Sequence, residues 1–409
     1  MNLLSTDTLS LLRRGPFARY IAGETISMLG TWMQQMAQGW VMASLTTSAF
    51  ALGMANFAVG IPILLLSMHA GLLADRADKR FIVFAALGAQ SVLAMTLGWL
   101  VGSGQIAVWH VVAAGVVLGI TTAFEMPAAA ALVPELVPRD RMHAAIAIDR
   151  AVFHATRLAG PALGGWMIGA MGAASAFYVN AVSYGALMIA LLTLSPRPRG
   201  TDAEEELRQT GLREGFTYAR GDEPTRRMLM LMSMSTLFVS PFFVVMLPLY
   251  AQHTLSLGAR EYGLLMAASG FGAFAGSIHL LSIAKTRRFA WLLGAVGCIF
   301  VAMVCLCLAR SLAVALLGMV ALTMGTSTLF GLAQTIVQER APDPLRGRVS
   351  AIVGLSFFGV IPFSGLAMSA IVDAIGVRTA LAASALCFGI GALALCLRQR
   401  AMRPINSDF

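Results

Sequence analysis

Charged residues are scarce in this chain. Of its 409 residues only 12% are Asp, Glu, Lys or Arg, whereas 58% are hydrophobic. Soluble domains carry roughly twice that charged fraction. Because so few charges cannot cover a water-facing surface, most of the chain must face lipid or its own interior. The series of soluble domains that the length alone would suggest is therefore excluded.

Groups that would mark an enzyme or a metal site are also missing. The five cysteines lie in apolar segments of the second half, without metal-ligand spacing to histidines and without a disulfide framework. We interpret them as packing residues and predict no metal or cofactor. No phosphate-binding Gly-x-x-x-x-Gly-Lys-Ser/Thr loop occurs, which disfavours ATP-driven transport. The absence of Ser–Lys, Ser–His or histidine–acid groups at one membrane depth argues against an intramembrane enzyme.

Long apolar runs are abundant instead. A helix needs about 20 apolar residues to cross a bilayer core. Such segments occur at 17–44, 50–74, 81–101, 105–133, 142–170, 173–194, 227–252, 260–284, 289–308, 312–338, 347–373 and 377–397. They predict an all-α, polytopic membrane protein with twelve transmembrane helices. No apolar stretch with a cleavage site precedes Pro16, so we expect the first span to be retained.

Basic residues gather on one side of these spans. Most of the 29 lysines and arginines fall before span one, after the even-numbered spans, and in the segment between spans six and seven. The loops on the other side hold only Arg260, Arg310 and Arg378. Because positively charged loops stay in the cytoplasm, both termini are predicted to be cytoplasmic. These loops, rather than nucleic-acid binding, explain the net charge of +9.

One long polar segment divides the chain. It separates a predicted N-terminal six-helix bundle, 1–195, from a C-terminal one, 227–409, by a cytoplasmic linker at 196–226. An N-cap pattern at Thr201 to Glu204 begins this linker. Apolar residues at helical spacing predict an amphipathic helix on the membrane surface: Leu207, Leu212, Phe216 and Tyr218. A plain tether explains the segment equally well.

The two halves of the chain share a short sequence pattern. Glu135 and Pro138 follow span four, and Glu339 and Pro342 follow span ten at the same spacing. With the matching order of spans, this predicts a parallel internal repeat. Two bundles related in this way leave a cleft between them, an arrangement that suits alternating access.

The loop after span two has a known pattern. It reads Gly71-Leu-Leu-Ala-Asp75-Arg76-Ala-Asp78-Lys79-Arg80. Gly71 permits close helix approach, and Asp75 stands at a helix end where arginines can pair with it. The pattern resembles the loop signature of the major facilitator superfamily, although Asp78 replaces a glycine. The resemblance implies that fold and a gating role for Gly71, Asp75, Arg76 and Arg80, whereas ordinary positive-inside residues are the alternative.

Span five carries a run rich in glycine and proline. It reads Arg157-Leu-Ala-Gly160-Pro161-Ala-Leu-Gly164-Gly165. Pro161 removes a backbone donor, and the glycines allow a neighbouring helix to come into backbone contact. The run is similar to the signature of the superfamily's exporters, with Thr156 in place of the first glycine. It therefore implies efflux, while a simple packing kink is the alternative.

Further segments resemble a narrower branch. They are Gly23-Glu-Thr-Ile-Ser-Met-Leu-Gly30-Thr-Trp32-Met-Gln34-Gln35, Pro127-Ala, Val133-Pro-Glu135-Leu-Val-Pro138 and Arg346-Gly-Arg348-Val. These look like the branch that contains the enterobactin exporter and macrolide efflux pumps, and the resemblance covers nearly the whole chain. The sequence departs from that branch at Glu24, at Ala129-Ala130 and at Asp149. Substrate and coupling therefore do not transfer directly.

Ionisable residues within the spans are confined to the first half. They are Glu24, Glu125, Asp149, Arg150, His154 and Arg157. Such groups cost a few kcal/mol in a bilayer and are functional candidates by default. At about 1.5 Å per residue the three acids and Arg150 lie at similar depth, with Arg157 deeper. The helical spacing of Arg150, His154 and Arg157 predicts one shared face that points away from lipid.

Two interpretations of these charges remain open. Either Glu125 or Glu24 binds and releases a coupling proton with Arg150 as its switchable partner, or the charges form static ion pairs. Other polar residues in the spans are candidates for the substrate cavity: Gln34, Gln38, Asn56, Asn180, Tyr184, Thr236 and Gln334. The 24 methionines and 22 phenylalanines suit an adaptable apolar pocket.

These features predict a secondary active transporter that exports a small amphipathic molecule across the cytoplasmic (inner) membrane by proton antiport. A siderophore or a drug is the favoured substrate, and a lysolipid stays open. We expect a monomer whose partners are the substrate, protons and the lipid bilayer, with no nucleic acid. A non-transporting membrane sensor is disfavoured because no soluble input or output domain is attached.

Overall fold

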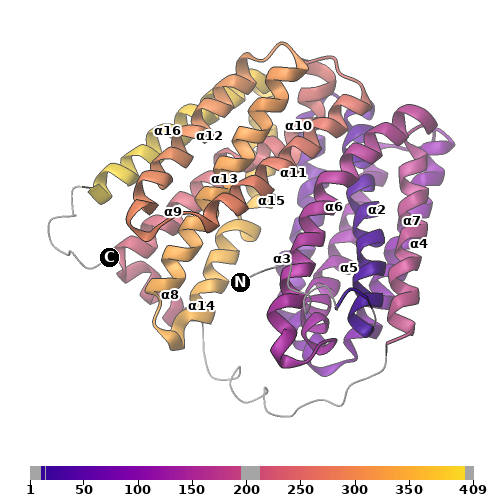
Figure 1. Ribbon diagram of the computed structural model, residues 1–409. Helices are drawn as coiled ribbons and strands as arrows, with labels where there is room; N and C mark the ends of the chain where they lie inside the picture. Colours follow the sequence, from indigo (N-terminus) through magenta and orange to yellow (C-terminus); the bar gives the residue numbers. More distant parts are fainter. Residues whose placement is uncertain (1–10, 14, 195–211, 401–409) are drawn as a thin grey trace. The chain divides into compact units, whose positions relative to one another are not determined.

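The computed structural model describes residues 11–13, 15–194 and 212–400, apart from the side chains of Asp75, Leu212, Arg213 and residues 397–400. Across this described part every regular element is a helix (Figure 1). The linker features predicted at Thr201, Glu204 and Leu207 lie outside the described residues.

Six long helices precede the linker. They are α2 (Pro16–Leu45), α3 (Ala49–Arg76), α4 (Lys79–Gly102), α5 (Val108–Glu135), α6 (Met142–Met171) and α7 (Ala174–Leu192). Local chemistry sets several of their ends: Pro16 opens α2, and the Ser48 and Asp78 side chains accept hydrogen bonds from the first turns of α3 and α4. Each helix lies within a few residues of a predicted span.

The rest of the chain is also helical. It forms α8 (Leu212–Gly221), α9 (Glu223–Phe238), α10 (Leu247–Leu249), α11 (Ala259–Leu281), α12 (Arg288–Leu308), α13 (Leu312–Arg340), α14 (Arg346–Gly354), α15 (Ile361–Ile375) and α16 (Val377–Arg400). The predicted amphipathic linker helix corresponds in its described part to α8.

Two predicted spans contain π-helical turns rather than one regular helix. Phe242–Met246 and Tyr250–Thr254 follow α9, and Leu355–Gly359 separates α14 from α15. Prolines flank or divide these turns, at positions Pro241, Pro248 and Pro362. Since proline lacks the N–H of a regular helical ladder, the local hydrogen-bond register must change there.

Ten helical segments of the described chain are long and apolar enough to cross a membrane. The predicted spans outside this set are α2 and α6, each 30 residues long. Their polar content explains the difference, because α2 carries Glu24 and several glutamines and α6 carries Asp149, Arg150 and Arg157. The two helices that fall short on apolar composition are thus those that hold most of the candidate coupling residues.

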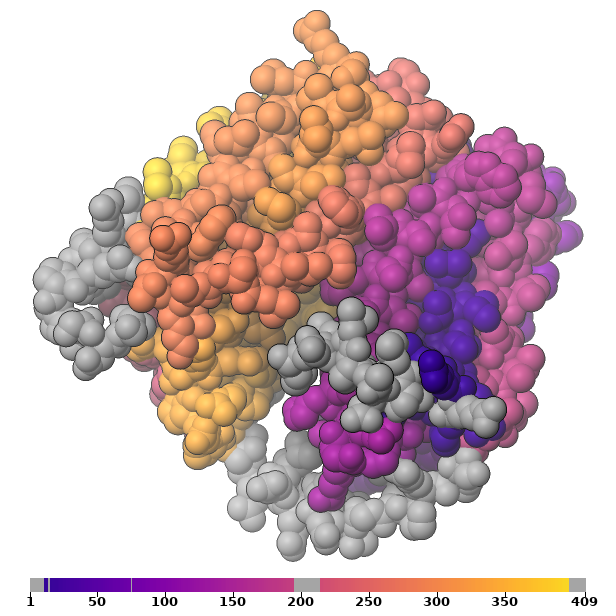
Figure 2. Space-filling model, in the orientation of Figure 1, coloured from indigo at the N-terminus to yellow at the C-terminus, as the bar shows by residue number. Residues whose placement is uncertain are grey.

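The chain divides into two compact units. The first contains α2 to α7 together with residues 251–267, and the second contains the remainder of the second half. In the first unit α2 lies between α6 and α7 on the face shown in Figure 2. α3 packs on α5, and α4 packs on α5 and α7. Tyr20, Leu87, Leu132 and Tyr184 are part of the buried core where these helices meet.

In the second unit α12 packs against α13 and α16, and α9 packs against the same two helices. The short helix α8 lies beside α14 (Figure 1). Met232, Leu322, Leu329 and Phe388 are fully buried within this packing. Residue burial in both units thus follows helix–helix contacts, while many large apolar side chains stay exposed, as expected for a surface in lipid.

The two positions that suggested an internal repeat have similar local structure, at one corner of each unit. After α5, Pro138 (φ −62°, ψ 153°) leads into the 3₁₀ turn Arg139–Arg141 and then α6. After α13, Pro342 (φ −54°, ψ 144°) leads into the 3₁₀ turn Asp343–Leu345 and then α14. The same backbone path therefore follows both prolines.

An ion pair anchors each of these corners. Lys79 Nζ lies 2.6 Å from Glu135 Oε1 at the end of α5. Arg288 donates two hydrogen bonds to Glu339 near the end of α13, at 2.5 and 3.1 Å. The glutamates that marked the repeat in the sequence thus tie the start of one helix to the end of the next in both units.

A polar latch fixes α8 in the second unit. Arg340 donates to both carboxylate oxygens of Asp222, at 2.8 and 3.0 Å, and its carbonyl accepts a hydrogen bond of 2.8 Å from the Tyr218 hydroxyl. Asp222 also caps α9 by accepting from the Thr225 backbone N–H at 3.0 Å. Arg348 pairs with Glu214 on α8. The latch therefore joins the linker helix to the α13–α14 corner.

We expect this latch to make stability depend on pH. Partial burial alone would raise the pKa of Asp222, but hydrogen bonds from Arg340 and Thr225 outweigh it and lower the pKa from 3.8 to about 2. A lowered folded-state pKa means that the stabilisation is full above about pH 4 and is lost as the pH falls toward 2. Allowing for solvent screening, about 1 kcal/mol is at stake.

Thermal unfolding of the detergent-solubilised protein tests this expectation. Asp222→Asn should lower the melting temperature at pH 7, and about half of that deficit should disappear at pH 3. Asp343→Asn is a matched control, because Asp343 pairs with Arg346 but its side chain is 85% exposed. An equal deficit for Asp222→Asn at both pH values would contradict the expectation.

Candidate functional site

A cluster of acids lies inside the first unit. Glu24 on α2 is only 6% exposed, and Tyr20, one helical turn earlier, is fully buried. The carboxyl of Asp149 on α6, which is half-buried, lies within interaction range of Glu24, as do the Tyr20 hydroxyl and the Glu125 carboxyl. Three carboxyl groups from α2, α5 and α6 therefore lie near one another.

A buried glutamine holds Glu125. Gln90 on α4 is 4% exposed, and its side-chain amide donates to Glu125 Oε2 at 2.6 Å and to Thr121 Oγ1 at 3.2 Å. The cluster thus draws on four helices of the first unit. Because three full negative charges are costly in one low-dielectric region, this group is the candidate site for proton binding.

The basic residues of α6 are spread apart. Arg150 is exposed, and among the described residues it forms no ion pair with an acid. The Arg157 guanidinium lies 5.6 Å from the ring centroid of Trp32 on α2, a cation–π contact. His154 is half-buried, with its ring edge-on to Phe153. Only the deeper part of the predicted basic face therefore turns toward α2.

Several predicted cavity residues instead join α2 to α7. The amide of Asn180 donates to Gln34 Oε1 at 2.7 Å, and Asn180 Oδ1 accepts from Ser183 at 2.9 Å. The Tyr184 hydroxyl lies 3.4 Å from Thr31 Oγ1. Gln34, Asn180 and Tyr184 are all buried. In this conformation they satisfy one another between helices.

The other cavity candidates do not form one group. Gln38 and Asn56 are half-buried on α2 and α3 of the first unit. In the second unit Thr236 is fully buried and donates to the Met232 carbonyl, whereas Gln334 is exposed on α13. Their polarity was visible in the sequence, but the direction in which each side chain points was not.

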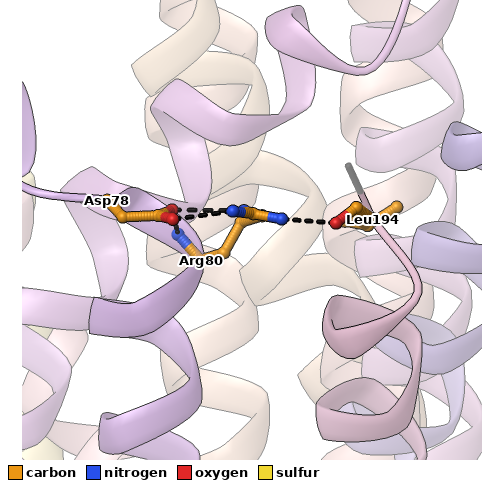
Figure 3. A network of polar contacts seen from close by, with 3 residues as sticks. All are labelled: Asp78, Arg80 and Leu194. Carbon is orange, nitrogen blue, oxygen red and sulfur yellow. Dashed lines mark hydrogen bonds and ion pairs between the residues drawn. The ribbon is translucent and has the colours of Figure 1, made fainter. Parts of the chain in front are cut away.

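The loop between α3 and α4 is organised by Asp78 and Arg80. Asp78 accepts hydrogen bonds from the Arg80 backbone N–H at 3.0 Å and from its guanidinium at 2.7 and 3.2 Å. The same guanidinium donates to the carbonyl of Leu194 beyond α7 (Figure 3). Asp78, which replaces a glycine of the similar loop signature, therefore positions Arg80, one of the residues predicted to have a gating role.

The remaining residues of this loop have looser surroundings. Arg76 is exposed at the end of α3, and the Asp75 side chain lies outside the described residues. A Cβ added to Gly71 would meet no other atom within 4 Å. The close helix approach expected at Gly71 is therefore wrong for this conformation, because this side of α3 faces open space.

Removing the Asp78 carboxylate is expected to weaken the start of α4. Its hydrogen bond from Arg80 lowers the pKa of Asp78, so the group is charged and paired at neutral pH. Asp78→Ala should destabilise the protein by about 1 kcal/mol, the usual loss of an N-cap. Asp78→Asn, which keeps the cap and loses the charge, should lie between Ala and wild type in thermal unfolding. Equal melting temperatures for all three would contradict this role.

The glycine–proline run of α6 sits at two close helix contacts. A Cβ on Gly164 would lie 3.1 Å from the Met33 Cα on α2. A Cβ on Gly165 would lie 2.7 Å from the Ala259 carbonyl and 3.1 Å from the Gly263 Cα, both in the α11 segment that belongs to the first unit. Gly160 packs equally tightly on Trp32, beside the kinking Pro161. The run thus brings α6 into backbone contact with two neighbours.

The sequence did not single out Tyr20 or Gln90. Both are uncharged, whereas the predicted site consists of acids and bases within the spans. A signal was present, since Gln90 is a lone amide in the middle of an apolar helix and Tyr20 lies four residues before Glu24. Amides and hydroxyls spaced one turn from a buried acid belong in such a search.

Known proteins resemble this chain along its length. A family model described as transmembrane secretion effector matches residues 6–408. The staphyloferrin A transporter of Staphylococcus aureus is 25% identical over 374 residues, covering 88% of this chain and 90% of that protein. The multidrug efflux pump Tap of Mycobacterium tuberculosis is 25% identical over 421 residues, covering 96% of each.

Solved structures add the fold. A bacterial homologue of the human lysosomal transporter Spinster, in its inward-facing and unoccupied conformation, superposes with a TM-score of 0.72 over 97% of this chain and 98% of that one. The two chains are 16% identical. At that identity the likeness concerns the fold alone.

Proposed function

Since the chain belongs to the transmembrane secretion effector family of the major facilitator superfamily, we propose that it exports a small amphipathic molecule from the cytoplasm. It is a multi-pass membrane transporter by family. The outward direction is supported by relatives named for efflux of drugs, and by the exporter-like run at Gly160 and Pro161. A siderophore or a drug is the proposed substrate, because one long-matching relative carries staphyloferrin A and another is a multidrug pump.

Proton antiport is the proposed energy source. The observation that carries this proposal is the group of Glu24, which is buried, and Asp149 and Glu125, which are half-buried, with the Tyr20 hydroxyl nearby and Gln90 hydrogen-bonded to Glu125. Charges inside a membrane persist where they serve transport. Glu24 or Glu125 binds the proton, while Arg150 and Arg157 lie on α6 within the same unit and supply the compensating positive charge when the conformation changes.

The membrane arrangement completes the proposal. Twelve helices cross the cytoplasmic (inner) membrane as two six-helix bundles, 1–195 and 227–409, with a cytoplasmic linker at 196–226 and both termini in the cytoplasm. The asymmetric distribution of lysine and arginine supports this orientation. Alternating access then occurs in a monomer, with the Asp78–Arg80 loop and its neighbours Gly71, Asp75 and Arg76 gating the cytoplasmic side.

Transport by proteoliposomes tests the proposal. Vesicles with an acidic interior should accumulate staphyloferrin A, or a cationic dye such as ethidium as a drug probe, because protons leave as the substrate enters. Accumulation should vanish when a protonophore removes the gradient, and should be absent from vesicles without protein.

Each alternative predicts a different result. Accumulation driven by an alkaline interior would show that substrate and protons move in the same direction, which is symport and not antiport. Flux that is indifferent to the pH gradient would overturn proton coupling while leaving a transporter. The absence of flux for every siderophore and drug probe would overturn the proposed substrate class.

A further inference from the structure

A cavity of about 780 Å³ opens in the second unit between α8, α9, α14 with the π-helical turn Leu355–Gly359 that follows it, and α16. Its wall is mainly apolar, but two arginines, Arg220 and Arg226, line it. None of the residues proposed above for proton coupling or substrate binding contributes to it. The cavity is thus a separate feature of the unit.

Among the described residues, the positive charge at the arginine end of this cavity is only partly balanced by acids. The acids of the corner are taken by other arginines: Glu214 by Arg348, Asp222 by Arg340 and Glu223 by Arg227. Arg226 keeps only a 3.9 Å approach to Glu223, and among the described residues Arg220 has no ion-pair partner. The Arg226 guanidinium donates to the Arg220 carbonyl at 3.1 Å, which holds the two residues together.

The apolar wall runs away from these arginines along one face of α9. Arg226, Met230, Met234 and Leu237 follow one another at helical spacing and all line the cavity. From Arg226 to Leu237 the rise is about 16 Å, at about 1.5 Å per residue. A bilayer core is about 30 Å thick. The groove is therefore about one leaflet deep, with its charge at the end of the span where a head group lies.

The opposite wall is formed by the segment after α14 and by α16. Ser356, in the π-helical turn between α14 and α15, lines the cavity, as does Gly391 on α16. Gly391 faces Met234 so closely that an added Cβ would collide with the methionine side chain. Met230 is 45% and Leu237 40% exposed, so the groove is open along its length. An open, mainly apolar groove of this length is suited to a single acyl chain.

We propose that this groove binds an anionic phospholipid of the surrounding membrane. The phosphate lies against Arg220 and Arg226, and one acyl chain follows α9 from Met230 to Leu237. The charge complementarity selects an anionic over a zwitterionic head group, and the one-leaflet depth selects a lipid over a free anion. Because the latch at Asp222 and Arg340 fixes α8, a bound lipid also stabilises the linker helix that supplies Arg220.

Lipid titration of the purified protein in detergent tests the inference. Dioleoyl phosphatidylglycerol, dioleoyl phosphatidylcholine and water-soluble glycerol phosphate are compared by native mass spectrometry and by the shift in melting temperature. Phosphatidylglycerol should bind with the highest affinity. Arg220→Ala combined with Arg226→Ala should weaken its binding about tenfold or more.

Two further variants make the test specific. Lys285→Ala combined with Arg287→Ala removes the same charge from exposed positions outside the groove, and should leave binding unchanged. Ser233→Phe keeps both arginines but fills the apolar wall beside Met234, and should weaken phosphatidylglycerol binding even if the double arginine variant fails to fold.

Three outcomes would overturn the inference. Equal affinity for phosphatidylcholine would show that the two arginines do not select an anionic head group. Equal affinity for glycerol phosphate would reduce the groove to an anion site. Undiminished phosphatidylglycerol binding by Ser233→Phe would mean that no acyl chain lies along α9. None of these results depends on whether the protein exports a siderophore or a drug.

Discussion

Proton-driven transport by the Glu24→Gln, Glu125→Gln double variant is expected to fall by about 100-fold, the scale on which removing a proton-exchanging group acts. Glutamine keeps the size of the side chain and can still hydrogen-bond to Gln90 or Tyr20, but it cannot take up a proton. The single variants then identify the carboxyl that carries the proton. Uptake of substrate into acid-loaded proteoliposomes is the measurement.

Substrate counterflow separates coupling from folding. Exchange of labelled for unlabelled substrate at equal pH needs the alternating conformations but no net proton movement, so the double variant should retain it. Asp140→Asn, at a site 76% exposed near the start of α6, should behave as wild type in both assays. Full pH-driven uptake by both single variants and by the double variant would contradict a role of Glu24 and Glu125 in proton coupling. It would favour static ion pairs instead.

Gly165→Val is expected to remove most transport activity together with about 2 kcal/mol or more of stability, as overpacking does. The valine Cβ would press on the Ala259 carbonyl and the Gly263 Cα, and backbone cannot move aside as a flexible side chain can. Thermal unfolding and uptake by the purified variant measure the two effects.

Gly169→Val is the matched control for this substitution. It lies one turn further along α6, where an added Cβ meets no atom within 4 Å. It should retain nearly wild-type melting and uptake. Similar losses at Gly165 and Gly169 would show that valine harms the helix itself, and that the contact with the α11 segment is not the cause.

The helices were predictable because each depends on local chemistry. Apolar runs of membrane-spanning length predicted most ends to within a few residues, and the Ser48 and Asp78 caps seen in the structure explain two of these ends. The π-helical turns at Phe242–Met246 and Leu355–Gly359 were not predicted. Their register depends on prolines together with the neighbouring helices, and an apolar run gives no sign of it.

The candidate site was only partly predictable for a different reason. Depth along a helix follows from residue number, which is why Glu24, Glu125 and Asp149 could be expected at one level. Rotation about the helix axis does not follow when apolar residues surround the helix on every side. Gln34 and Asn180 therefore looked like cavity residues, although they hydrogen-bond to each other, and Arg150 looked like a partner for an acid although it is exposed.

The corners at Glu135 and Glu339 follow the same backbone path, but their ion pairs differ in the number of hydrogen bonds. Lys79 holds Glu135 by one contact, whereas Arg288 grips Glu339 by two parallel hydrogen bonds. A bidentate pair fixes both the distance and the relative orientation of its two groups, whereas an ammonium group can rotate about its single contact. We therefore expect the corner of the first unit to be the more flexible of the two. The duplicated backbone path thus carries two different degrees of stiffness, one in each unit.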